Sequence, residues 1–202
     1  MRNKNEDKHQ RILDAAVKVF ARKGFYQSKV SEIAKAAGVA DGTIYLYFKN
    51  KEDLLISVFE VEMQALVSKF RSAIAAEKDP PSQLRKIIAM HLSELQAYPE
   101  LAAVFQVELR QSSRFMREYK KLELKQYLDL IGGIIEEGQR SGHFRQNLPV
   151  GLVKRAIFGT LDELVSTWVL AGNRYDLESL ADSVTDIFLN GIRQDASLPE
   201  KN

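Results

Sequence analysis

Residues 28–55 read SKVSEIAKAAGVADGTIYLYFKNKEDLL, and two short helices can be traced through them. From Val30 to Ala37 the apolar residues fall at i, i+3, i+4 and i+7, the spacing of one face of an α-helix. Gly38 follows, where a left-handed residue ends a helix at little steric cost. A second short helix is predicted over residues 43–48. Two short helices joined by a tight glycine turn predict a helix-turn-helix, whose second helix lies in the major groove of DNA.

The second helix carries side chains that suit nucleic acid. Thr43, Tyr45 and Tyr47 offer hydroxyl groups to phosphate oxygens, and the threonine methyl group and tyrosine rings can rest on base edges. Lys49 and Lys51 follow, and Lys51 is expected in the first turn of the next helix, where the positive end of the helix dipole favours a phosphate. An ordinary helical hairpin would explain the glycine turn, but its surface helix is seldom so aromatic.

Residues 33–54 resemble the DNA-binding signature of the TetR family of bacterial repressors. In that family a recognition helix of the form G-T-[IL]-Y-x-[YH]-F precedes K-N-K-E-[DE]-L, and residues 42–54 here read GTIYLYFKNKEDL. Members often carry Ser or Thr at the position of Ala40, so we expect the helix cap to pass to Asp41. Asn50 is expected to cap the following helix, with Asp53 at its third position. The candidate DNA-binding residues are Lys29, Ala40, Asp41, Gly42, Thr43, Ile44, Tyr45, Tyr47, Lys49 and Lys51.

Charge and composition agree with a DNA-binding regulator. Residues 1–52 carry 11 Lys or Arg against 6 Asp or Glu, whereas residues 53–202 carry 18 against 21. Only the first part therefore suits a polyanion, although a solvated basic face gives the same count. We expect a DNA-binding domain at residues 1–52 and an effector-binding and dimerisation domain at residues 53–202.

The composition also excludes several classes of protein. The chain has no cysteine, which rules out disulfides, thiolate metal sites and cysteine nucleophiles. It contains neither the apolar region of a secretory signal nor an uncharged apolar run long enough to cross a membrane. We therefore expect a cytoplasmic protein.

The rest of the pattern predicts helices and no strand. The first helix is expected at residues 4–22, ended by Gly24, and the prolines of Asp79-Pro80-Pro81 mark a break because neither fits a helix interior. Further helices are predicted at residues 51–77, 82–97, 100–111, 114–140, 149–170 and 177–193. The expected fold class is all-α, with about nine helices in a TetR-like arrangement.

The last two predicted helices carry more apolar surface than one covering layer needs. Such a helix lies either deep in a core or in a subunit interface. The TetR resemblance implies the interface, because members dimerise through a four-helix bundle of their last two long helices. Symmetry also favours a dimer, because a protein with a two-fold axis matches the two halves of a palindromic operator. A homodimer is therefore expected.

Large apolar residues and a group of arginines in the second part indicate a ligand site. An apolar interior with a cationic mouth suits an amphiphile with an anionic head. Apolar residues of this kind usually form plain core, and a solvated helix face explains the arginines as well as a ligand site does. The candidate ligand-binding residues are Leu92, Phe105, Leu109, Arg110, Arg114, Ile134, Phe158, Leu161 and Trp168.

Three segments resemble the FadR (YsiA) subgroup of the TetR family, repressors of fatty-acid β-oxidation genes in Gram-positive bacteria. They are GVADGTIYLYFKNKEDLL at residues 38–55, ELRQS at 108–112 and IFGTLDELVSTWV at 157–169. The resemblance implies that long-chain acyl-CoA is the effector, with its tail in the second domain and its phosphates near basic residues. It implies no cofactor, no metal and no catalytic residue.

Other functions fit the sequence less well. An enzyme fits poorly, since the chain has three histidines and none of the common hydrolase or phosphate-binding motifs. His91 and Glu94 could share a metal, but two ligands do not make a site. Asp162 and Glu163 stand out in an apolar helix, where buried carboxylates are more often paired than catalytic. A multidrug-type repressor and a non-specific architectural DNA binder stay open as alternatives.

Overall fold

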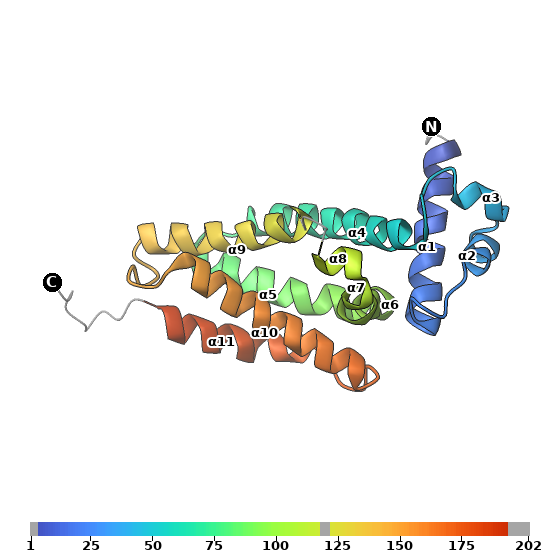
Figure 1. Ribbon diagram of the computed structural model, residues 1–202. Helices are drawn as coiled ribbons and strands as arrows, with labels where there is room; N and C mark the ends of the chain where they lie inside the picture. Colours follow the sequence, from blue (N-terminus) through green and yellow to red (C-terminus); the bar gives the residue numbers. More distant parts are fainter. Residues whose placement is uncertain (1–3, 118–121, 194–202) are drawn as a thin grey trace. The chain divides into compact units, whose positions relative to one another are not determined.

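The computed structural model describes residues 4–117 and 122–193, in which every regular element is a helix (Figure 1). The prediction of an all-α fold is confirmed. One isolated antiparallel bridge joins Phe144 to Arg193. None of the described helices combines the length and the apolar character needed to cross a bilayer.

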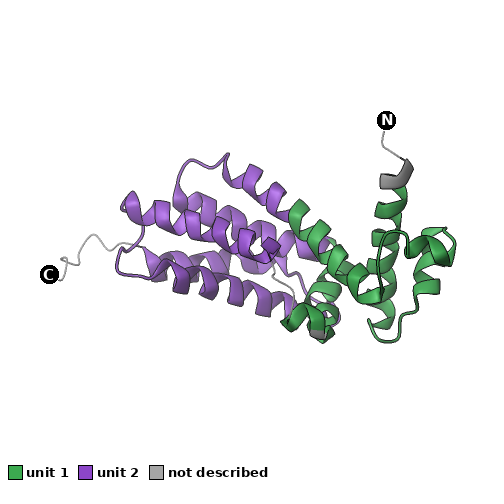
Figure 2. Ribbon diagram, turned by 45° about the horizontal axis from the view of Figure 1, so that its top comes forward, with its two compact units in different colours: residues 1–65, 98–121 green, residues 66–97, 122–202 purple. Residues whose placement is uncertain are grey.

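Two compact units make up the structure (Figure 2). The first combines residues 1–65 with residues 98–121, and the second combines residues 66–97 with residues 122–202. The first unit therefore contains the predicted DNA-binding domain together with a segment that lies much later in the sequence.

The first unit is built on α1 (Lys4–Lys23), α2 (Val30–Ala37), α3 (Asp41–Ile44) and the first part of α4 (Lys51–Ile74). The later segment adds α6 (Pro99–Ala103), the π-helix η1 (Val104–Glu108), α7 (Leu109–Gln111) and α8 (Ser113–Arg117). A shared apolar core closes the helix-turn-helix, since one face of each helix is buried. Its fully buried members include Ile12, Ala16, Phe20, Ile33, Ala34, Leu54, Leu55 and Val58.

The predicted helices of this unit agree with the structure to different degrees. The first helix ends at Gly24 with φ +81°, and α2 has the predicted bounds. The recognition helix, predicted at residues 43–48, begins at Asp41 and ends at Ile44. Tighter turns carry the chain onward, because the amides of Leu46 and Tyr47 donate to carbonyls three residues earlier. The helix predicted at residues 100–111 is present as α6, η1 and α7 in succession.

The second unit contains the end of α4, α5 (Pro80–Ala97), α9 (Leu122–Arg140), α10 (Val150–Leu170), η2 (Glu178–Leu180) and α11 (Ala181–Ile192). The helix α5 begins at Pro80 rather than at residue 82, because Asp79 accepts a hydrogen bond from the Ser82 amide and both prolines fit the first turn. The long helix predicted at residues 114–140 corresponds to α8 and α9, and residues 118–121 between them lie outside the described part.

In the core of the second unit, α9 packs closely against the turn that follows it. Gly138 lies under the ring of Phe144, and a Cβ atom at this glycine would come within 2.0 Å of Phe144 Cδ2.

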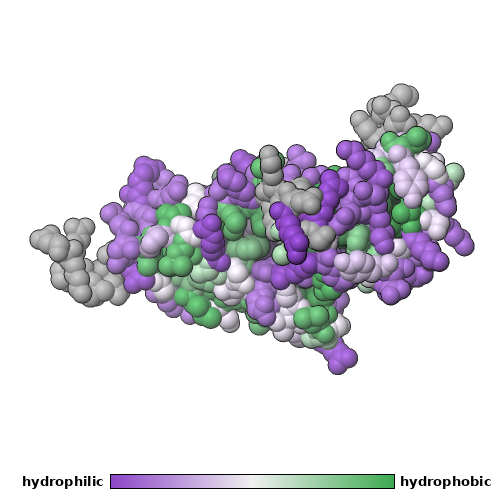
Figure 3. Space-filling model, viewed as in Figure 1, coloured by the Kyte–Doolittle hydropathy of each residue, from purple (hydrophilic) through white to green (hydrophobic). Residues whose placement is uncertain are grey.

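Apolar side chains also reach the surface of the second unit, where Figure 3 shows them between hydrophilic residues. Leu152, Leu170 and Ile187 are 62%, 77% and 69% exposed. Ile187 belongs to α11, the last helix, and its side chain lies at the surface rather than in the core.

Candidate nucleic-acid interface

The turn between α2 and α3 depends on glycine for two reasons. Gly38 has φ +66°, and its amide donates to Lys35 O at 3.2 Å. Arg11 reaches over from α1 and donates to the carbonyls of Ala37 and Gly38. A Cβ atom at Gly38 would lie 2.8 Å from Nη2 of that arginine. The first helix therefore holds the turn in place through a contact that leaves no room for a side chain.

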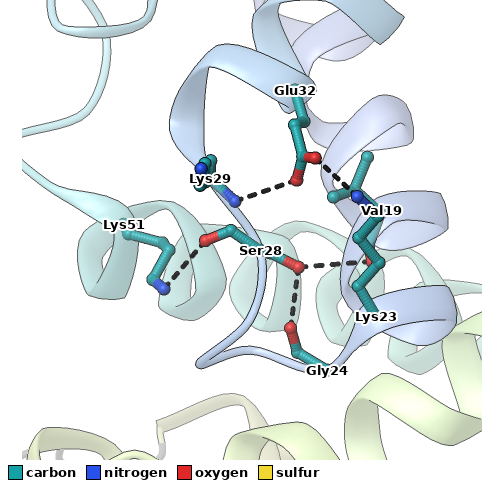
Figure 4. A network of polar contacts seen from close by, with 7 residues as sticks. All are labelled: Val19, Lys23, Gly24, Ser28, Lys29, Glu32 and Lys51. Carbon is teal, nitrogen blue, oxygen red and sulfur yellow. Dashed lines mark hydrogen bonds and ion pairs between the residues drawn. The ribbon is translucent and has the colours of Figure 1, made fainter.

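The chain between α1 and α2 is tied down by polar contacts (Figure 4). Ser28 is 3% exposed, and its hydroxyl donates to Gly24 O at 2.7 Å. Lys23 pairs with Glu32 at 2.5 Å, and the Lys29 amide donates to the other oxygen of the same carboxylate. The hydrogen bond from Lys23 is the main reason that the pKa of Glu32 lies below its usual value. These bonds fix the angle at which α2 leaves α1.

Lys51 is the centre of this arrangement. Its ammonium group donates to the carbonyls of Phe25, Tyr26 and Ser28 at 2.7, 3.2 and 3.0 Å. It also lies 4.6 Å from the centroid of the Phe25 ring, within the range of a cation–π contact. Burial lowers the pKa of Lys51. The side chain of the first residue in α4 is thus turned inward, onto the chain between α1 and α2.

The caps of α3 and α4 differ. Asn50 Oδ1 accepts a hydrogen bond from the Asp53 amide at 2.8 Å, and Asp53 accepts one from the Lys49 amide at 2.9 Å, which confirms the predicted cap of α4. The predicted cap of α3 is wrong. Ala40 occupies the N-cap position with no side-chain hydrogen bond, and Asp41 is the first helical residue. The carboxylate of Asp41 therefore lies in the first turn of α3, where the helix dipole favours it.

The exposed face beside α3 contains most of the predicted DNA-binding residues. Lys29, Ala40, Asp41, Gly42 and Lys49 are exposed, Tyr45 is 58% exposed, and Thr43 is half-buried. A hollow of about 480 Å³ opens on this face, lined by Ser28, Lys29, Val30, Ser31, Asp41, Tyr45, Asn50 and Lys51. Its hydroxyl, amide and ammonium groups are donors of the kind that bind phosphate oxygens.

Three predicted contact residues have other partners in the structure. Ile44 is 1% exposed and belongs to the core of the first unit. Tyr47 is half-buried, with its ring 5.8 Å from that of His9 in α1. Lys51 is engaged with the three carbonyls described above. A role in DNA binding for these three stays a prediction, and their side chains hold the recognition face in position.

Sequence reasoning did not select Ser28, Ser31 and Asn50, which also line the hollow. Their small polar side chains carry no pattern that separates them from ordinary turn and cap residues. It also missed Leu46, an apolar side chain that is 81% exposed immediately after α3. A leucine between two tyrosines of the recognition segment was the signal available in the sequence, since apolar groups can contact thymine methyl groups.

The candidate ligand-binding residues fall in both units. Phe105, Leu109, Arg110 and Arg114 belong to the first unit, and Leu92, Ile134, Phe158, Leu161 and Trp168 belong to the second. Leu92, Leu109, Ile134, Leu161 and Trp168 are buried, Phe105, Phe158 and Arg114 are half-buried, and Arg110 is exposed. The indole N–H of Trp168 donates a hydrogen bond to the carbonyl of Tyr175 at 2.8 Å. Ligand binding by this set stays a prediction.

Within the first unit, the later segment is fastened to the DNA-binding helices. Glu108 is 7% exposed and accepts a hydrogen bond from the Phe25 amide at 2.5 Å. Ser112 donates to Glu52 at 2.7 Å, and Arg114 Nη1 lies 3.5 Å from Asp53 Oδ1. These three contacts, which we call the clasp, join residues 108–114 to the turn after α1 and to the first turn of α4.

Polar groups in the second unit include a buried pair on α5 and α9. Nδ1 of His91 lies 2.8 Å from the hydroxyl of Tyr127, and both side chains are buried. Glu94, which could have shared a metal with His91, is paired with Lys69. Burial lowers the pKa of His91 to about 4, against a smaller opposite effect of Asp162, which raises it. The histidine is therefore neutral at physiological pH.

Comparison with known proteins places the chain in a class. Residues 12–58 match the family described as bacterial regulatory proteins, tetR family, and residues 59–191 match the family described as YsiA-like protein, C-terminal region. Together with the helix-turn-helix geometry, these matches show that the chain belongs to the TetR family of DNA-binding transcription regulators.

Within this family, the chain is similar to regulators of fatty acid metabolism. The chain is 46% identical over 185 residues to the fatty acid metabolism regulator protein of Bacillus subtilis, covering 92% of this chain and 95% of that one. A crystal structure of the transcriptional regulator FadR from B. subtilis in complex with stearoyl-CoA superposes with a TM-score of 0.86, at 46% identity over 91% of this chain and 99% of that chain. The fatty acid degradation regulator FadR from Bacillus halodurans gives a TM-score of 0.85 at 45% identity, over 91% and 99% of the two chains. These relatives are transcription regulators.

The placement of Lys51 gives a test that separates a structural lysine from a phosphate-binding one. Lys51→Met should lower the free energy of unfolding by about 1–2 kcal/mol, because the ammonium group that donates to three carbonyls is lost. Lys49→Met, on the exposed side, should leave stability unchanged. It should reduce the slope of log affinity for DNA against log salt by about 0.9, the loss of one phosphate contact. Urea unfolding and DNA titrations at several salt concentrations measure both quantities. Unchanged stability in Lys51→Met, with a reduced salt slope, would show that its ammonium binds phosphate instead.

Proposed function

We propose that this protein is a transcriptional repressor of fatty-acid β-oxidation genes that leaves a palindromic operator when long-chain acyl-CoA binds. The observation that supports this most strongly is the 46% identity, over 92% of the chain, to the fatty acid metabolism regulator of B. subtilis. A FadR structure from that organism contains stearoyl-CoA. In this proposal residues 1–52 bind DNA, and residues 53–202 bind the effector and form the dimer.

The DNA-binding half of the proposal rests on the exposed face beside α3. Thr43 and Tyr45 would contact bases and sugars, while Lys29 and Lys49 would contact phosphates. The chain of contacts from Arg11 and Lys51 holds the face rigid, so little ordering entropy is lost when DNA binds.

The switch requires a difference in affinity between two conformations. Acyl-CoA releases the operator if it binds better to a conformation in which the two recognition helices of a dimer no longer match successive major grooves. A near-complete switch needs a differential affinity of roughly 5 kcal/mol. Each buried methylene contributes about 0.8 kcal/mol, so a long acyl tail supplies enough if part of it distinguishes the two conformations.

The clasp is the route that we propose for this coupling. Residues 98–117 follow α5 and precede α9, two helices of the second unit, yet Glu108, Ser112 and Arg114 are bonded to α4 and to the turn after α1. A movement at either end of this segment is therefore delivered by the backbone to contacts on the DNA-binding helices. Because Glu108 is buried, its hydrogen bond is shielded from competing water.

A homodimer through α10 and α11 completes the proposal. The exposed apolar side chains of Leu152, Leu170 and Ile187 lie on these helices, and exposed leucine and isoleucine are stabilised by burial in an interface. A dimer places two copies of α3 on a two-fold operator.

A second candidate is a repressor of the same family that responds to another hydrophobic ligand. The chain is 26% identical, over 90% of its length, to the transcriptional repressor KstR2 of Rhodococcus jostii. A structure of KstR2 from Mycobacterium tuberculosis is described as a ketosteroid transcriptional regulator. A steroid is therefore one comparison ligand, and an aromatic cation, which suits the multidrug-type alternative, is the other.

Operator release tests the proposed function directly. Footprinting on DNA upstream of β-oxidation genes should show a protected palindrome, and palmitoyl-CoA at micromolar concentration should remove the protection. Free CoA, a steroid and an aromatic cation serve as controls and should leave it in place. Protection that persists with palmitoyl-CoA but disappears with a control ligand would favour the second candidate.

The clasp predicts a variant in which binding and release are uncoupled. Glu108→Ala should bind operator and palmitoyl-CoA each within a few-fold of the unmodified protein, since neither ligand is expected to touch Glu108. The factor by which palmitoyl-CoA lowers operator affinity should fall at least tenfold, which is a loss of about 1.4 kcal/mol of coupling. Glu100→Ala, an exposed change in α6, is the matched control. An unchanged coupling factor in Glu108→Ala would remove the clasp from the mechanism.

The dimer predicts the effect of a charge on α11. Ile187→Glu should raise the dimer dissociation constant at least about tenfold, because a carboxylate is costly to bury without a partner. Sedimentation equilibrium measures this constant. Tyr98→Glu, at an exposed tyrosine of the first unit, should leave this constant unchanged. A monomer of the unmodified protein at micromolar concentration would contradict the proposed dimer.

A further inference from the structure

His91 presents a buried nitrogen that the structure leaves without use. The side chain is 7% exposed, and its Nε2 atom has no hydrogen-bond partner among residues 4–117 and 122–193. The ring lies among aromatic side chains of the second unit. Its centroid is 5.6 Å from that of Tyr127, which is in turn 5.6 Å from Phe70 and 5.9 Å from Phe158.

The partner of the other ring nitrogen decides which hydrogen-bonding role Nε2 plays. Burial raises the pKa of Tyr127, so its hydroxyl keeps its proton. Within the described residues that hydroxyl has Nδ1 of His91 as its hydrogen-bond partner, at 2.8 Å. If the hydroxyl donates to Nδ1, a neutral imidazole carries its own proton on Nε2. Nε2 is then a buried N–H donor.

A buried donor without an acceptor is unfavourable, and natural proteins seldom keep one without a purpose. Phenylalanine or leucine would fill the same volume among these rings at no such cost. Asp162 is the charged group whose field reaches the histidine, and Tyr127 is the other titratable group against it. The ring pair is therefore best understood as a polar position prepared for an acceptor brought by a ligand.

We propose that Nε2 of His91 donates a hydrogen bond to the thioester carbonyl of the acyl-CoA effector. This inference rests on the proposed function and adds a residue that recognises one functional group of the effector. The saturated tail contains no polar atom beyond the carbonyl, and the nucleotide part is a hydrated polyanion that is too costly to bury among aromatic rings. The thioester carbonyl is thus the acceptor that can accompany the tail into an apolar interior. Phe158, a predicted ligand-binding residue, contacts Tyr127 and connects the pair to that predicted site.

The proposal predicts discrimination between an ester and an ether of sulfur. Palmitoyl-CoA and S-hexadecyl-CoA have the same number of tail carbons, but the second has a methylene group in place of the carbonyl. The unmodified protein should bind palmitoyl-CoA about tenfold more tightly, because the thioether leaves the donor unsatisfied. Calorimetry gives the two affinities, and operator release confirms that each ligand occupies the effector site.

Two variants locate the discrimination. In His91→Phe, which keeps the ring volume, the ratio of the two affinities should fall to about one. His143→Phe, at an exposed histidine of the same unit, should keep the tenfold ratio. A ratio that persists in His91→Phe would overturn the proposal.

A measurement on the unmodified protein keeps the proposal testable if His91→Phe does not fold. Nitrogen-15 spectra of labelled histidine report the tautomer of each of the three histidines. The His91 signal should show a proton on Nε2, and the Nε2–H resonance should shift with palmitoyl-CoA more than with S-hexadecyl-CoA. A proton on Nδ1, or equal binding and release by both ligands, would overturn this inference and leave the proposed function standing. Failure of both ligands to bind would instead remove the proposed function.

Discussion

The position of the recognition face depends on one ammonium group, that of Lys51. It meets three carbonyls of residues 25–28, a stretch of backbone between two helices that has no regular partner of its own. Because Lys51 is the first residue of α4, this contact ties the start of that helix to the end of α1. The segment that contains α2 and α3 lies between the two ends so joined. A lysine that looks like a phosphate ligand in the sequence thus determines where the predicted DNA-binding residues are placed.

The sequence was sufficient wherever a short-range rule decides the structure. The spacing of apolar residues located α2 to the residue, and a left-handed glycine ended α1 and α2 where expected. The cap of α4 by Asn50 followed from the same kind of rule. Ala40 shows the limit of this reasoning. Without a capping side chain, α3 begins at Asp41 and ends after one turn, and its length is set by packing of Ile44 and Phe48 in the core.

The contacts that distinguish this chain from an isolated helix-turn-helix could not be predicted, because they join residues far apart in sequence. Glu108 would be assigned to the surface by its charge, since carboxylates are rarely buried unless paired. The π-helix Val104–Glu108 adds to the difficulty, because a local five-residue hydrogen-bonding pattern is invisible to an analysis that assumes 3.6 residues per turn. The candidate ligand-binding residues share this problem. Apolar residues that line a ligand and apolar residues that fill a core have the same sequence pattern, and only the polar atoms among them can tell the two apart.

Polar atoms in apolar surroundings therefore carry more functional information here than the apolar residues around them. Glu108 and His91 are both buried, and they differ in whether their polar atoms have a partner. The Glu108 carboxylate already has the Phe25 amide as a partner, so it stabilises the arrangement that the structure shows. Nε2 of His91 has none among the described residues, so a ligand that brings an acceptor to it stabilises whichever arrangement allows that hydrogen bond. A satisfied group and an unsatisfied group of this kind bias an equilibrium in opposite directions, and a small differential free energy at each is enough to shift a two-state population. Binding at two sites is thermodynamically reciprocal. If operator DNA favours the arrangement in which Glu108 is bonded to Phe25, and acyl-CoA favours another, then each ligand weakens the binding of the other by the same factor.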